Sequence, residues 1–466
     1  MKKYTVTAWI TLLLCLLSTG VILYAHGQLT AQGEDVSVTE TVLFGDKKEA
    51  EGVAVTTYGY FSAGMNKVLH WKSVSSQRTD GLQTESEYCL NDTDAWNVPS
   101  NIPSATFDLR AGLPEDCSYD EVAPELDNSL KKVIEDASEG TQPGKTSTKI
   151  VDLSDYISSL PLYFRVFGRH GDDFVTDSGY FQFPLAENGF WKITTTKDAQ
   201  GKLTEASIAS AAKLDLWSLT AFDSESHLLY LAIDEFYQGS AAWSIPADQC
   251  GIHKIPLKKI ADKENPDQAI YPDMSRAELL YPLDPDTKIR SMEVDSYRNN
   301  LLLFTEENGQ LLMSVISLDD GTLKQKLVVF AGADDPSEIS PMPQVRKDYI
   351  LIWDQAQSPG FLYLCPDKDG SGYHIEGQSA FDGIMPEGYV ISERADAFDG
   401  DRLVIACQPY DDNGRPINSS YLMVFRKSDL VYAGKYQNSL DTVYKAYRYY
   451  SQVWPWSYLA VSINGK

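Results

Sequence analysis

Short apolar runs separated by turns rich in Asp, Asn and Gly dominate the later part of the chain. The clearest example is residues 298–330, RNNLLLFTEENGQLLMSVISLDDGTLKQKLVVF, in which three apolar runs are separated at Asn308-Gly309 and at Asp320-Gly321. Asn-Gly and Asp-Gly favour the positive φ angles that tight hairpins need. The pattern predicts a meander of three antiparallel strands, and the run IRSMEVDS before it supplies a fourth strand.

This unit recurs. A charged or Asn-containing turn leads into an apolar strand at five places, and the last four are about 50 residues apart. The runs are HLLYLAI, LLLFT, YILIWD, RLVIAC and WSYLAVSI, beginning at His227, Leu301, Tyr349, Arg402 and Trp456. Repeats of about 40–50 residues with four strands each are typical of propeller blades. Counting residues 162–168 with 190–208 as one more unit predicts about six blades, and residues 74–150 are a candidate seventh.

The two ends of the repeat region are expected to complete each other. Residues 52–73 hold two strand-like runs around Gly64-Met65-Asn66, and the final run, WSYLAVSI, lies half-way through a unit. Joining them would close a ring and remove its exposed sheet edges. In its repeated pattern of short apolar runs and turns, the segment 155–466 resembles extracytoplasmic β-propeller proteins in general. The sequence therefore predicts an all-β fold, a β-propeller-like ring of about six or seven four-stranded blades within residues 51–466.

Two stretches interrupt this texture. Residues 26–50 are polar and are predicted to form a tether, and residues 74–150, rich in Ser, Thr, Asp, Asn and Pro, a loop-rich insertion or cap. Within the insertion, residues 123–137, APELDNSLKKVIEDA, have helical periodicity and predict one helix. The residues expected on its buried face are Leu126, Leu130, Val133 and Ile134.

The N-terminus carries an uncharged apolar run. Lys2 and Lys3 precede VTAWITLLLCLLSTGVILY, residues 6–24, whose length is near the ~20 residues that a membrane-crossing helix needs. Two preceding lysines favour a cytoplasmic N-terminus, with the bulk of the chain outside. A cleaved signal peptide is the alternative, with residues 25–27 as the cleavage region, but the apolar run is longer than a typical signal core. We expect residues 1–25 to be a cytoplasmic stub and a single transmembrane anchor.

The net charge of the chain narrows the classes of binding partner that we expect. The formal net charge is −26, which repels polyphosphate and anionic lipid, so nucleic acid is not an expected partner. Cationic partners and divalent ions are compatible with it. The sequence predicts no cofactor, and the membrane is expected as a partner only through the N-terminal helix.

The cysteines suggest one disulfide. Cys89 and Cys117 bracket a polar stretch that a bridge would restrain, and they form the disulfide candidate. Cys365 and Cys407 lie in the apolar runs FLYLC and RLVIAC, which predicts small buried residues. The sequence has no CxxC motif and no Cys/His cluster, which gives little support to a structural zinc site.

Residues 366–377, PDKDGSGYHIEG, partly match a calcium-binding loop. Asp367, Asp369 and Ser371 fall at the first, third and fifth places, with Gly372 at the sixth. The twelfth place, which should hold a bidentate Glu, is Gln378. The segment also follows a strand-like run, where the other units have hairpin turns. A structural turn is the preferred interpretation, and a calcium site is the alternative.

Catalytic motifs are weak. HExxH, GxSxG, phosphate-loop and dinucleotide-binding patterns are absent from the sequence. Ser-x-x-Lys spacing occurs at Ser129/Lys132 and at Ser210/Lys213, but such matches are frequent by chance. His170, within residues 169–173 (RHGDD), lies beside two carboxylates, where a turn is the simpler interpretation.

The expected positions of residues in the ring suggest further candidates for a functional site. The inner strands of a propeller line its mouth, which points to Arg290, Glu293, Glu393 and Arg394, although ordinary salt bridges between blades explain them as well. An aromatic cluster could stack on sugars or pack where the ring closes. Its members are Tyr447, Tyr449, Tyr450, Trp454 and Trp456.

These observations predict a membrane-anchored extracytoplasmic binding or scaffolding protein, in keeping with a bacterial envelope, that engages a protein or cell-envelope ligand. The alternative is a carbohydrate-active enzyme with carboxylates in the propeller funnel, since glycoside hydrolysis uses a pair of carboxyl groups. A calcium-dependent adhesin or sensor is a third reading. A propeller by itself does not choose among them, because the fold hosts many functions.

Overall fold

The structure is a computed structural model whose chain divides into two compact units. Unit 1 comprises residues 1–100, 358–361 and 375–466, and unit 2 comprises residues 101–357 and 362–374. The structure describes residues 16–21, 23–24, 38–63, 66–79, 81–90, 106–114, 118–124, 126–168, 171–177, 179–185, 190–211, 214–223, 225–238, 246–260, 269–330, 339–354, 360–380, 384, 390–410, 419–438 and 452–465.

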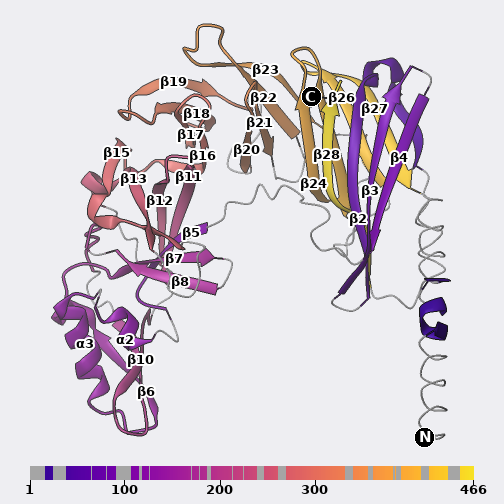
Figure 1. The fold of residues 1–466 in the computed structure, drawn as a ribbon. Helices are drawn as coiled ribbons and strands as arrows, with labels where there is room; N and C mark the ends of the chain where they lie inside the picture. Colours follow the sequence, from indigo (N-terminus) through magenta and orange to yellow (C-terminus); the bar gives the residue numbers. More distant parts are fainter. Residues whose placement is uncertain are drawn as a thin grey trace, which may run out of the picture. The chain divides into compact units, whose positions relative to one another are not determined.

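Strands make up most of the regular structure of the described residues, 61% of which are in strands, and this confirms the predicted all-β class. The strands form seven small antiparallel sheets, an arrangement consistent with a propeller-like all-β fold (Figure 1). The short helices are α2 (Tyr119–Val122), α3 (Asn128–Ser138) and the 3-10 turns η1 (Lys47–Ala50), η2 (Leu153–Asp155), η3 (Ala247–Gln249) and η4 (Met274–Arg276).

In unit 1, strands from the two ends of the chain share one sheet. Its order is β28-β2-β3-β4, with β28 at Gln452–Ile463, β2 at Val53–Ala63, β3 at Asn66–Arg78 and β4 at Gly81–Leu90. Val53 pairs with Ile463 and Val55 with Val461 in an antiparallel register. The predicted joining of the N-terminal strand pair to the last apolar run is therefore confirmed, and Figure 1 shows the yellow β28 beside the purple β2.

The second sheet of unit 1 corrects the predicted tether. Its order is β1-β27-β26-β25-β24, with bounds Val38–Gly45, Asp429–Asn438, Ser419–Arg426, Leu403–Tyr410 and Val390–Phe398 in that order. The outermost strand, β1, pairs with β27 along its length, with Val38 opposite Asn438 and Gly45 opposite Tyr432. Residues 38–50 were predicted to lie in a polar tether, but they fold into the domain.

A buried carboxylate fixes β1 in that sheet. Glu40 of β1 accepts hydrogen bonds from Gln77 of β3 and from Tyr432 and Tyr436 of β27, and it forms an ion pair with Lys47. The Glu40 side chain is only 5% exposed. A buried carboxylate is stable only when its oxygens are paired, so these donors and β1 depend on one another.

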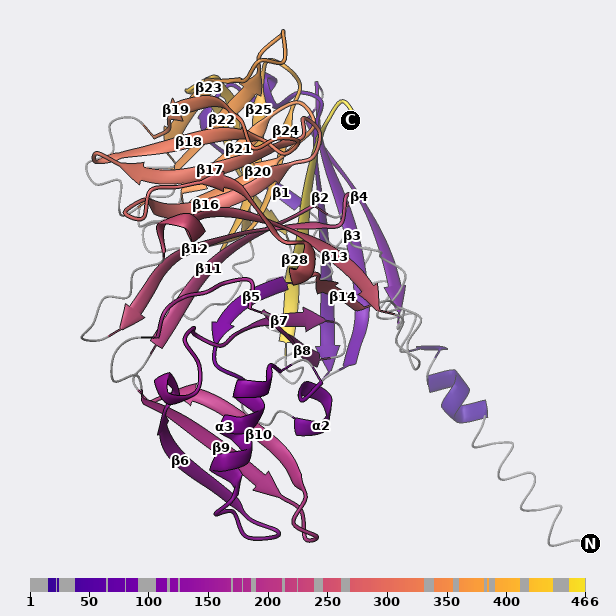
Figure 2. The same ribbon diagram turned by 90° about the vertical axis from the view of Figure 1, so that its left-hand side faces the viewer.

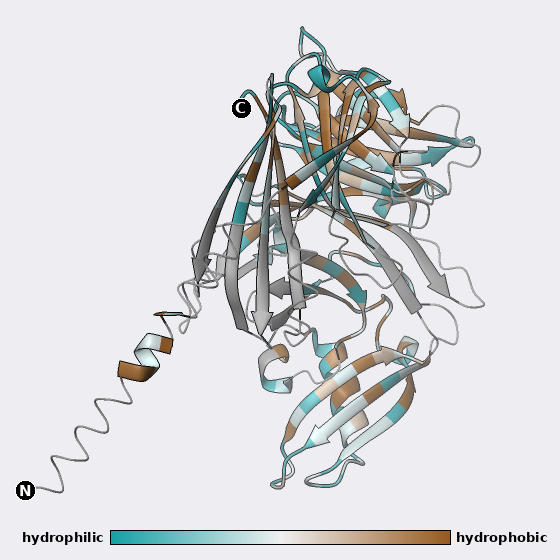
Figure 3. Ribbon diagram, turned by 90° about the vertical axis from the view of Figure 1, so that its right-hand side faces the viewer, coloured by the Kyte–Doolittle hydropathy of each residue, from teal (hydrophilic) through white to brown (hydrophobic). Residues whose placement is uncertain are grey.

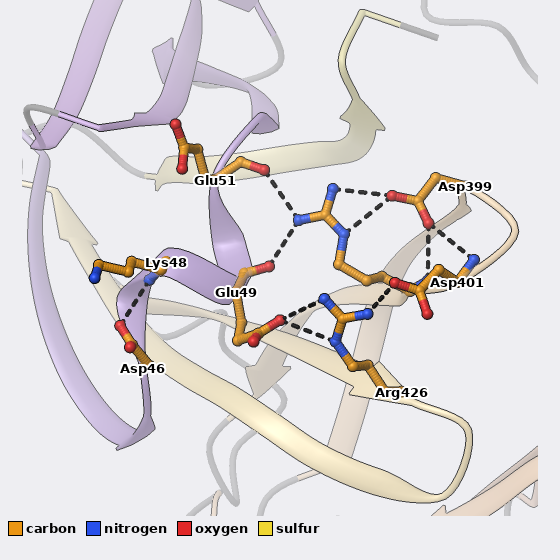
Figure 4. A network of polar contacts seen from close by, with 8 residues as sticks. Asp46, Lys48, Glu49, Glu51, Asp399, Asp401 and Arg426 are labelled. Atoms are coloured by element: carbon orange, nitrogen blue, oxygen red, sulfur yellow. Dashed lines mark hydrogen bonds and ion pairs between the residues drawn. The ribbon is translucent and has the colours of Figure 1, made fainter.

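A second network holds the connection between β1 and β2 (Figure 4). Nη1 of Arg402 donates to the backbone oxygens of Glu49 and Glu51, at 2.8 and 3.0 Å. Its Nε and Nη2 both donate to Oδ2 of Asp399. Arg426 pairs with the Glu49 carboxylate at 2.9 Å. The planar guanidinium suits this task because it presents several donors in a fixed geometry.

Three sheets of unit 2 have three, five and four strands, of which only the last has the predicted four, and part of a fourth also belongs to this unit. The first three are β5 (Thr106–Ala111), β7 (Leu162–Gly168) and β8 (Gly171–Thr176); β11 (Leu214–Asp223), β12 (Leu228–Gln238), β13 (Gly251–Ile260), β14 (Ala269–Pro272) and β15 (Glu278–Pro282); and β16 (Lys288–Asp295), β17 (Asn300–Glu307), β18 (Gln310–Ser317) and β19 (Leu323–Val328). The fourth is β20 (Pro341–Val345), β21 (Ile350–Asp354), β22 (Gly360–Pro366) and β23 (Tyr373–Ala380), and the unit boundaries fall within it. The first strands are neighbours: β5 contacts β11, β11 contacts β16, and β16 contacts β20.

The predicted meander at residues 288–328 is confirmed. β16, β17, β18 and β19 pair in sequence order, and Asn308 and Gly309 have φ angles of 50° and 71° in the turn between β17 and β18. The buried faces of β17 and β18 pack into two apolar clusters, which include Leu302 and Phe304 on one side and Leu301 and Leu303 on the other. A strand buried on both faces explains the continuous apolar run LLLF.

Replacing Gly309 tests this turn. Gly309→Ala should lower the free energy of unfolding by about 1 kcal/mol, the penalty of a left-handed conformation for a residue with a Cβ. No atom lies within 4 Å of the position that this Cβ would take, so the backbone alone sets the effect. Gly309→Asn should lose less, because Asn tolerates this region. Urea unfolding of both variants measures the difference, and an Ala variant as stable as the wild type would contradict the turn.

In three sheets, an Asp lies at or just after the end of the first strand and stabilises the turn into the apolar second strand. This accounts for the charged residues that precede the apolar runs in the sequence. Oδ1 of Asp223 accepts from the backbone N–H two residues later, at 3.0 Å. Oδ1 of Asp399 accepts from the backbone N–H of Arg402, at 2.8 Å. Asp295 pairs instead with the Arg298 side chain, at 2.9 Å. In each case a carboxylate satisfies donors of the turn into the second strand, as Asp does in Asx turns.

The predicted blade built from residues 162–168 and 190–208 is wrong. β7 pairs with β5 and β8, whereas β9 (Phe190–Lys197) and β10 (Leu203–Ser210) form a separate three-stranded sheet with β6 (Thr146–Asp152). Helices α2 and α3 contact this sheet, and Figure 2 shows them beside β6, β9 and β10. Residues 74–150 thus supply strands as well as the predicted helix.

The expected helix and its buried face are confirmed. Asp127 caps α3 by accepting hydrogen bonds from the backbone N–H groups of Ser129 and Leu130, at 2.6 and 2.9 Å. The residues predicted to face the core are buried in the apolar cluster shared by α3 and the neighbouring sheets. These are Leu126, Leu130, Val133 and Ile134.

At the N-terminus, residues 16–21, 23 and 24 are helical, and Figure 3 colours part of this short helix as hydrophobic. Leu16, Leu17 and Val21 are among its exposed apolar side chains. Within the described part of the chain, the helices are all too short or too polar to cross a membrane. Residues 1–15 of the predicted anchor lie outside the described residues.

Candidate functional site

A pocket of about 280 Å³ lies in unit 2, between the start of α3 and the sheet β5-β7-β8. This volume is at the small end of the range of about 300–1,000 Å³ that ligand pockets occupy. Four stretches of chain line it. They contribute Gly112 and Leu113; Leu126, Asp127 and Leu130; Ile157, Ser159, Leu160, Pro161 and Leu162; and Thr176, Asp177, Gly179 and Phe181.

Asp177 is the unusual residue of this lining. It directly follows β8, and only 3% of its surface is exposed. Its backbone N–H donates to the oxygen of Leu162 at 2.9 Å, and its Oδ2 accepts from the N–H of Phe181 at 2.9 Å. Oδ1 is buried and has no hydrogen-bond partner among the described residues. A buried oxygen of this kind carries a desolvation penalty until a donor reaches it.

Burial controls the ionisation of Asp177. Loss of water contact raises the pKa of its carboxyl to about 7, although the nearby backbone N–H groups of Phe181 and Gly179 act in the opposite direction. Near neutral pH, the group is therefore divided between its charged and neutral forms. A strongly shifted carboxyl in a pocket is the type of residue that marks functional sites.

Tyr180, in the segment that follows Asp177, contacts the buried side chain of His253. The hydroxyl of Tyr180 lies 3.0 Å from Nδ1 of His253, and Nε2 of His253 lies 3.0 Å from the backbone oxygen of Gln249. Because a carbonyl only accepts, Nε2 donates and Nδ1 accepts from Tyr180. Burial lowers the pKa of His253 to about 4, so the ring is neutral at pH 7. These contacts position residues 180–183, and His253 is a core residue.

The second carboxylate of the pocket is already engaged. Oδ1 of Asp127 caps α3, so it offsets the partial positive charge of the helix N-terminus. Ser129 and Lys132 of the candidate Ser–Lys pair are both exposed on α3 and do not line the pocket. In the pair Ser210/Lys213, Lys213 lies outside the described residues. The serine–lysine matches thus gain no support.

The candidates chosen by ring position fall in both units: Arg290 and Glu293 in unit 2, and Arg394 in unit 1. Arg290 forms an ion pair with Glu306 of the neighbouring strand β17, within one sheet and not between two blades. Glu293 is half-buried, and burial raises the pKa of its carboxyl to about 7. Arg394 belongs to the other unit and is half-buried, which lowers its pKa. The side chain of Glu393 lies outside the described residues.

The calcium-like segment forms a tight turn between β22 and β23. Oδ1 of Asp369 accepts hydrogen bonds from the N–H and the hydroxyl of Ser371, at 3.0 and 2.7 Å. The N–H of Asp367 donates to the oxygen of Gly372, and Gly370 has a φ of +73°. Among the described residues, no group of three or more His, Cys, Asp or Glu could hold a metal ion. The segment therefore has the structure of a turn.

Several sequence candidates lie outside what the structure describes. Cys117 is not described, nor is the side chain of Cys89, so the disulfide stays a prediction. The same holds for His170 and for the aromatic cluster. The side chains concerned there are Tyr447, Tyr449, Tyr450, Trp454 and Trp456. Cys407 is buried, as its apolar run predicted, and Cys365 is half-buried.

Sequence reasoning missed Asp177. The only local signal is an Asp-Ser-Gly turn between apolar residues, VTDSGYF, and many turns of this chain look alike. The other residues of its pocket come from segments distant in sequence, such as those around Leu113, Leu130 and Leu160.

Comparison with known proteins yields fold-level similarities alone. No protein-family model matches the chain, and no curated protein matches it. Among solved structures, a protein assigned as a 6-phosphogluconolactonase from Bacteroides fragilis is 12% identical, with 82% of this chain and 97% of that chain covered and a TM-score of 0.30. An α-L-arabinofuranosidase from Podospora anserina, in complex with cellotriose, is 11% identical, with coverage of 72% and 97% and a TM-score of 0.24. Similarities this distant carry no argument about activity.

Proposed function

We propose that this chain is a propeller-like binding protein and that a small ligand occupies the Asp177 pocket. The observation that carries the proposal is Asp177, whose buried Oδ1 has no partner among the described residues and which is part of the lining of a pocket made mostly of apolar side chains. A ligand that donates a hydrogen bond to this oxygen would relieve the desolvation penalty, and its apolar part would gain from burial.

Binding is favoured over the carbohydrate-active alternative. Glycoside hydrolysis needs two carboxyl groups acting on opposite sides of one bond. The pocket has two, but Asp127 is engaged as the cap of α3, and a helix cap is a structural role. We therefore expect the ligand to leave the pocket unchanged.

The cellular location of the proposed binding protein is inferred from its sequence. We propose that residues 6–24 anchor the chain in a membrane, with the folded part outside the cell facing a protein or cell-envelope ligand. We also propose that the sheets close into one ring. The neighbouring first strands in unit 2, and the pairing of the two chain ends in unit 1, are what such a ring requires of each unit.

Blocking the pocket tests the proposed function. Ser159 lines the pocket and Ser158 is its exposed neighbour outside the lining, so Ser159→Phe should fill the pocket whereas Ser158→Phe should not. We expect compounds in a thermal-shift screen of small metabolites to stabilise the wild type and Ser158→Phe but not Ser159→Phe. Compounds that stabilise all three proteins equally bind elsewhere and would contradict the proposal.

An assay for turnover separates the two functions. The full chain should release no sugar from a panel of envelope and plant glycans. Release that disappears in Asp177→Asn would overturn the binding role in favour of the enzyme.

A further inference from the structure

We propose that the ligand of the Asp177 pocket is a small organic monocation, an ammonium attached to a compact apolar body. This inference rests on the proposed function, because it assumes that the pocket is the ligand site. It adds the chemical class of the ligand, which follows from the charges and the surfaces around Asp177.

The pocket selects against anions. Asp127 and Asp177 are its only charged lining residues, and Lys, Arg and His are absent from the lining that the structure describes. The N-terminus of α3 could attract an anion, but Asp127 already caps it. A phosphate or carboxylate would enter beside two acidic side chains without a cation to pair with.

The pocket also suits an organic cation better than a metal ion. Hard cations such as Ca²⁺ take six to eight oxygen ligands. Here one oxygen of each carboxylate already accepts backbone N–H groups, and Asp177 Oδ1 is the one oxygen shown to be buried and unpaired. An ammonium needs fewer acceptors, and Asp177 can supply both a hydrogen bond and the opposite charge.

The walls of the pocket are largely apolar. Leu113, Leu126, Leu160 and Phe181 line the pocket and are all almost fully buried. Apolar area removed from water contributes roughly 25 cal/mol per Å². A compact hydrocarbon or aromatic body would therefore add affinity that a bare ammonium ion lacks.

Such a ligand would displace a proton. The titratable groups around Asp177 are Asp127 at the start of α3, Tyr180 on its own segment, His253 of β13 behind Tyr180, and Glu278 of β15. None is a cation at neutral pH, because His253 is neutral. Binding a cation requires the ionised Asp177, and burial raises the pKa of that carboxyl to about 7. Below pH 7 the affinity should fall about tenfold per pH unit.

Calorimetry on the full chain tests this with probes of similar size and different charge. The probes are 2-phenylethylammonium, 2-phenylethanol and phenylacetate, with cyclohexylammonium as an aliphatic cation. We expect both ammonium compounds to bind at least tenfold more tightly than the alcohol or the carboxylate at pH 7.5. Titrations at pH 6 in buffers of different ionisation enthalpy should show about one proton released per ligand.

Three variants complete the test. Asp177→Asn should remove both the preference for the cation and the proton release. Asp127→Asn preserves the helix cap, because Asn caps as well as Asp, and it should weaken cations by less than Asp177→Asn. Asp286→Asn, an exposed position outside the pocket lining, should have no effect.

The outcomes separate this inference from the proposed function. Tighter binding of the alcohol or the carboxylate, abolished by Ser159→Phe, would overturn the cation and leave the binding pocket standing. Failure of both ammonium probes to bind at 1 mM would also overturn the inference. The proposed function would fall only if the thermal-shift screen gave no pocket-dependent ligand of any class.

Discussion

Replacing Asp177 with Asn should make the protein more stable at pH 8 and leave its stability nearly unchanged at pH 4. Burial raises the pKa of Asp177 from 3.8 to about 7, so the folded state keeps a proton that the unfolded state has lost. Stability therefore falls as pH rises from about 4 to about 7, by up to about 4 kcal/mol. Asn cannot ionise, but its amide N–H₂ also needs acceptors, so we expect a net gain of about 2 kcal/mol at pH 8.

The measurement is urea unfolding of both proteins at pH 4, 6 and 8. His253 provides an internal check, because its pKa is lowered to about 4 by burial. Its contribution to stability is complete above pH 6.5 and is lost as pH falls towards 4. The two groups act in opposite directions in the wild type, so Asp177→Asn should uncover a steeper loss in acid. A variant that is less stable than the wild type at pH 8 would show that the ionised carboxylate stabilises the fold.

The elements predicted correctly are those whose signals are local. In residues 288–328, each turn carries residues that favour positive φ, and each strand is a run of apolar side chains. Helix α3 combines a cap at Asp127 with helical periodicity. The pairing of β2 with β28 followed from counting, since an unpaired strand set at one end needed the incomplete unit at the other.

The strands that the sequence did not predict lie at the edges of their sheets. β1, VTETVLFG, exposes most of its side chains, and β4, GLQTESEYCL, and β6, TSTKIVD, are rich in Thr, Ser, Glu and Gln. A strand with one solvated face has no continuous apolar run, so its composition resembles that of a loop. These strands are stabilised by their partners β27, β3 and β9, which lie far away in sequence for β1 and β6.

The site was missed for a related reason. Turns of Asp, Gly and Ser recur throughout the chain, and most of their carboxylates satisfy nearby backbone donors in the turn, as Asp369 does. Asp177 differs because the fold covers it: only 3% of its surface is exposed, and segments around Leu113, Leu130 and Leu160 line the same pocket. That covering is a property of the tertiary fold, which no local spacing reveals. Glu293 was found by position alone, and burial gives it a similarly raised pKa.

A chain that begins at Gly52 should be much less stable than one that begins at residue 37. The shorter chain lacks β1 and η1, which sequence analysis placed in a tether and the structure places in the sheet with β27. Its loss would leave Gln77, Tyr432 and Tyr436 without the Glu40 carboxylate that accepts their hydrogen bonds. Each buried polar group left unsatisfied costs about 1–3 kcal/mol, so we expect a loss of at least about 4 kcal/mol.

A second effect should accompany the loss of stability. Without β1, the edge of β27 is uncovered, and an exposed edge promotes pairing between chains. We expect the chain from Gly52 to elute as aggregates in size-exclusion chromatography and to be cut rapidly by protease. The chain from residue 37 is the matched control, because it removes the predicted anchor and residues 26–36 of the predicted tether but keeps β1 and should match the full chain. Equal urea midpoints for the two truncated chains would show that residues 38–50 are dispensable, and the tether would then extend to residue 50 after all.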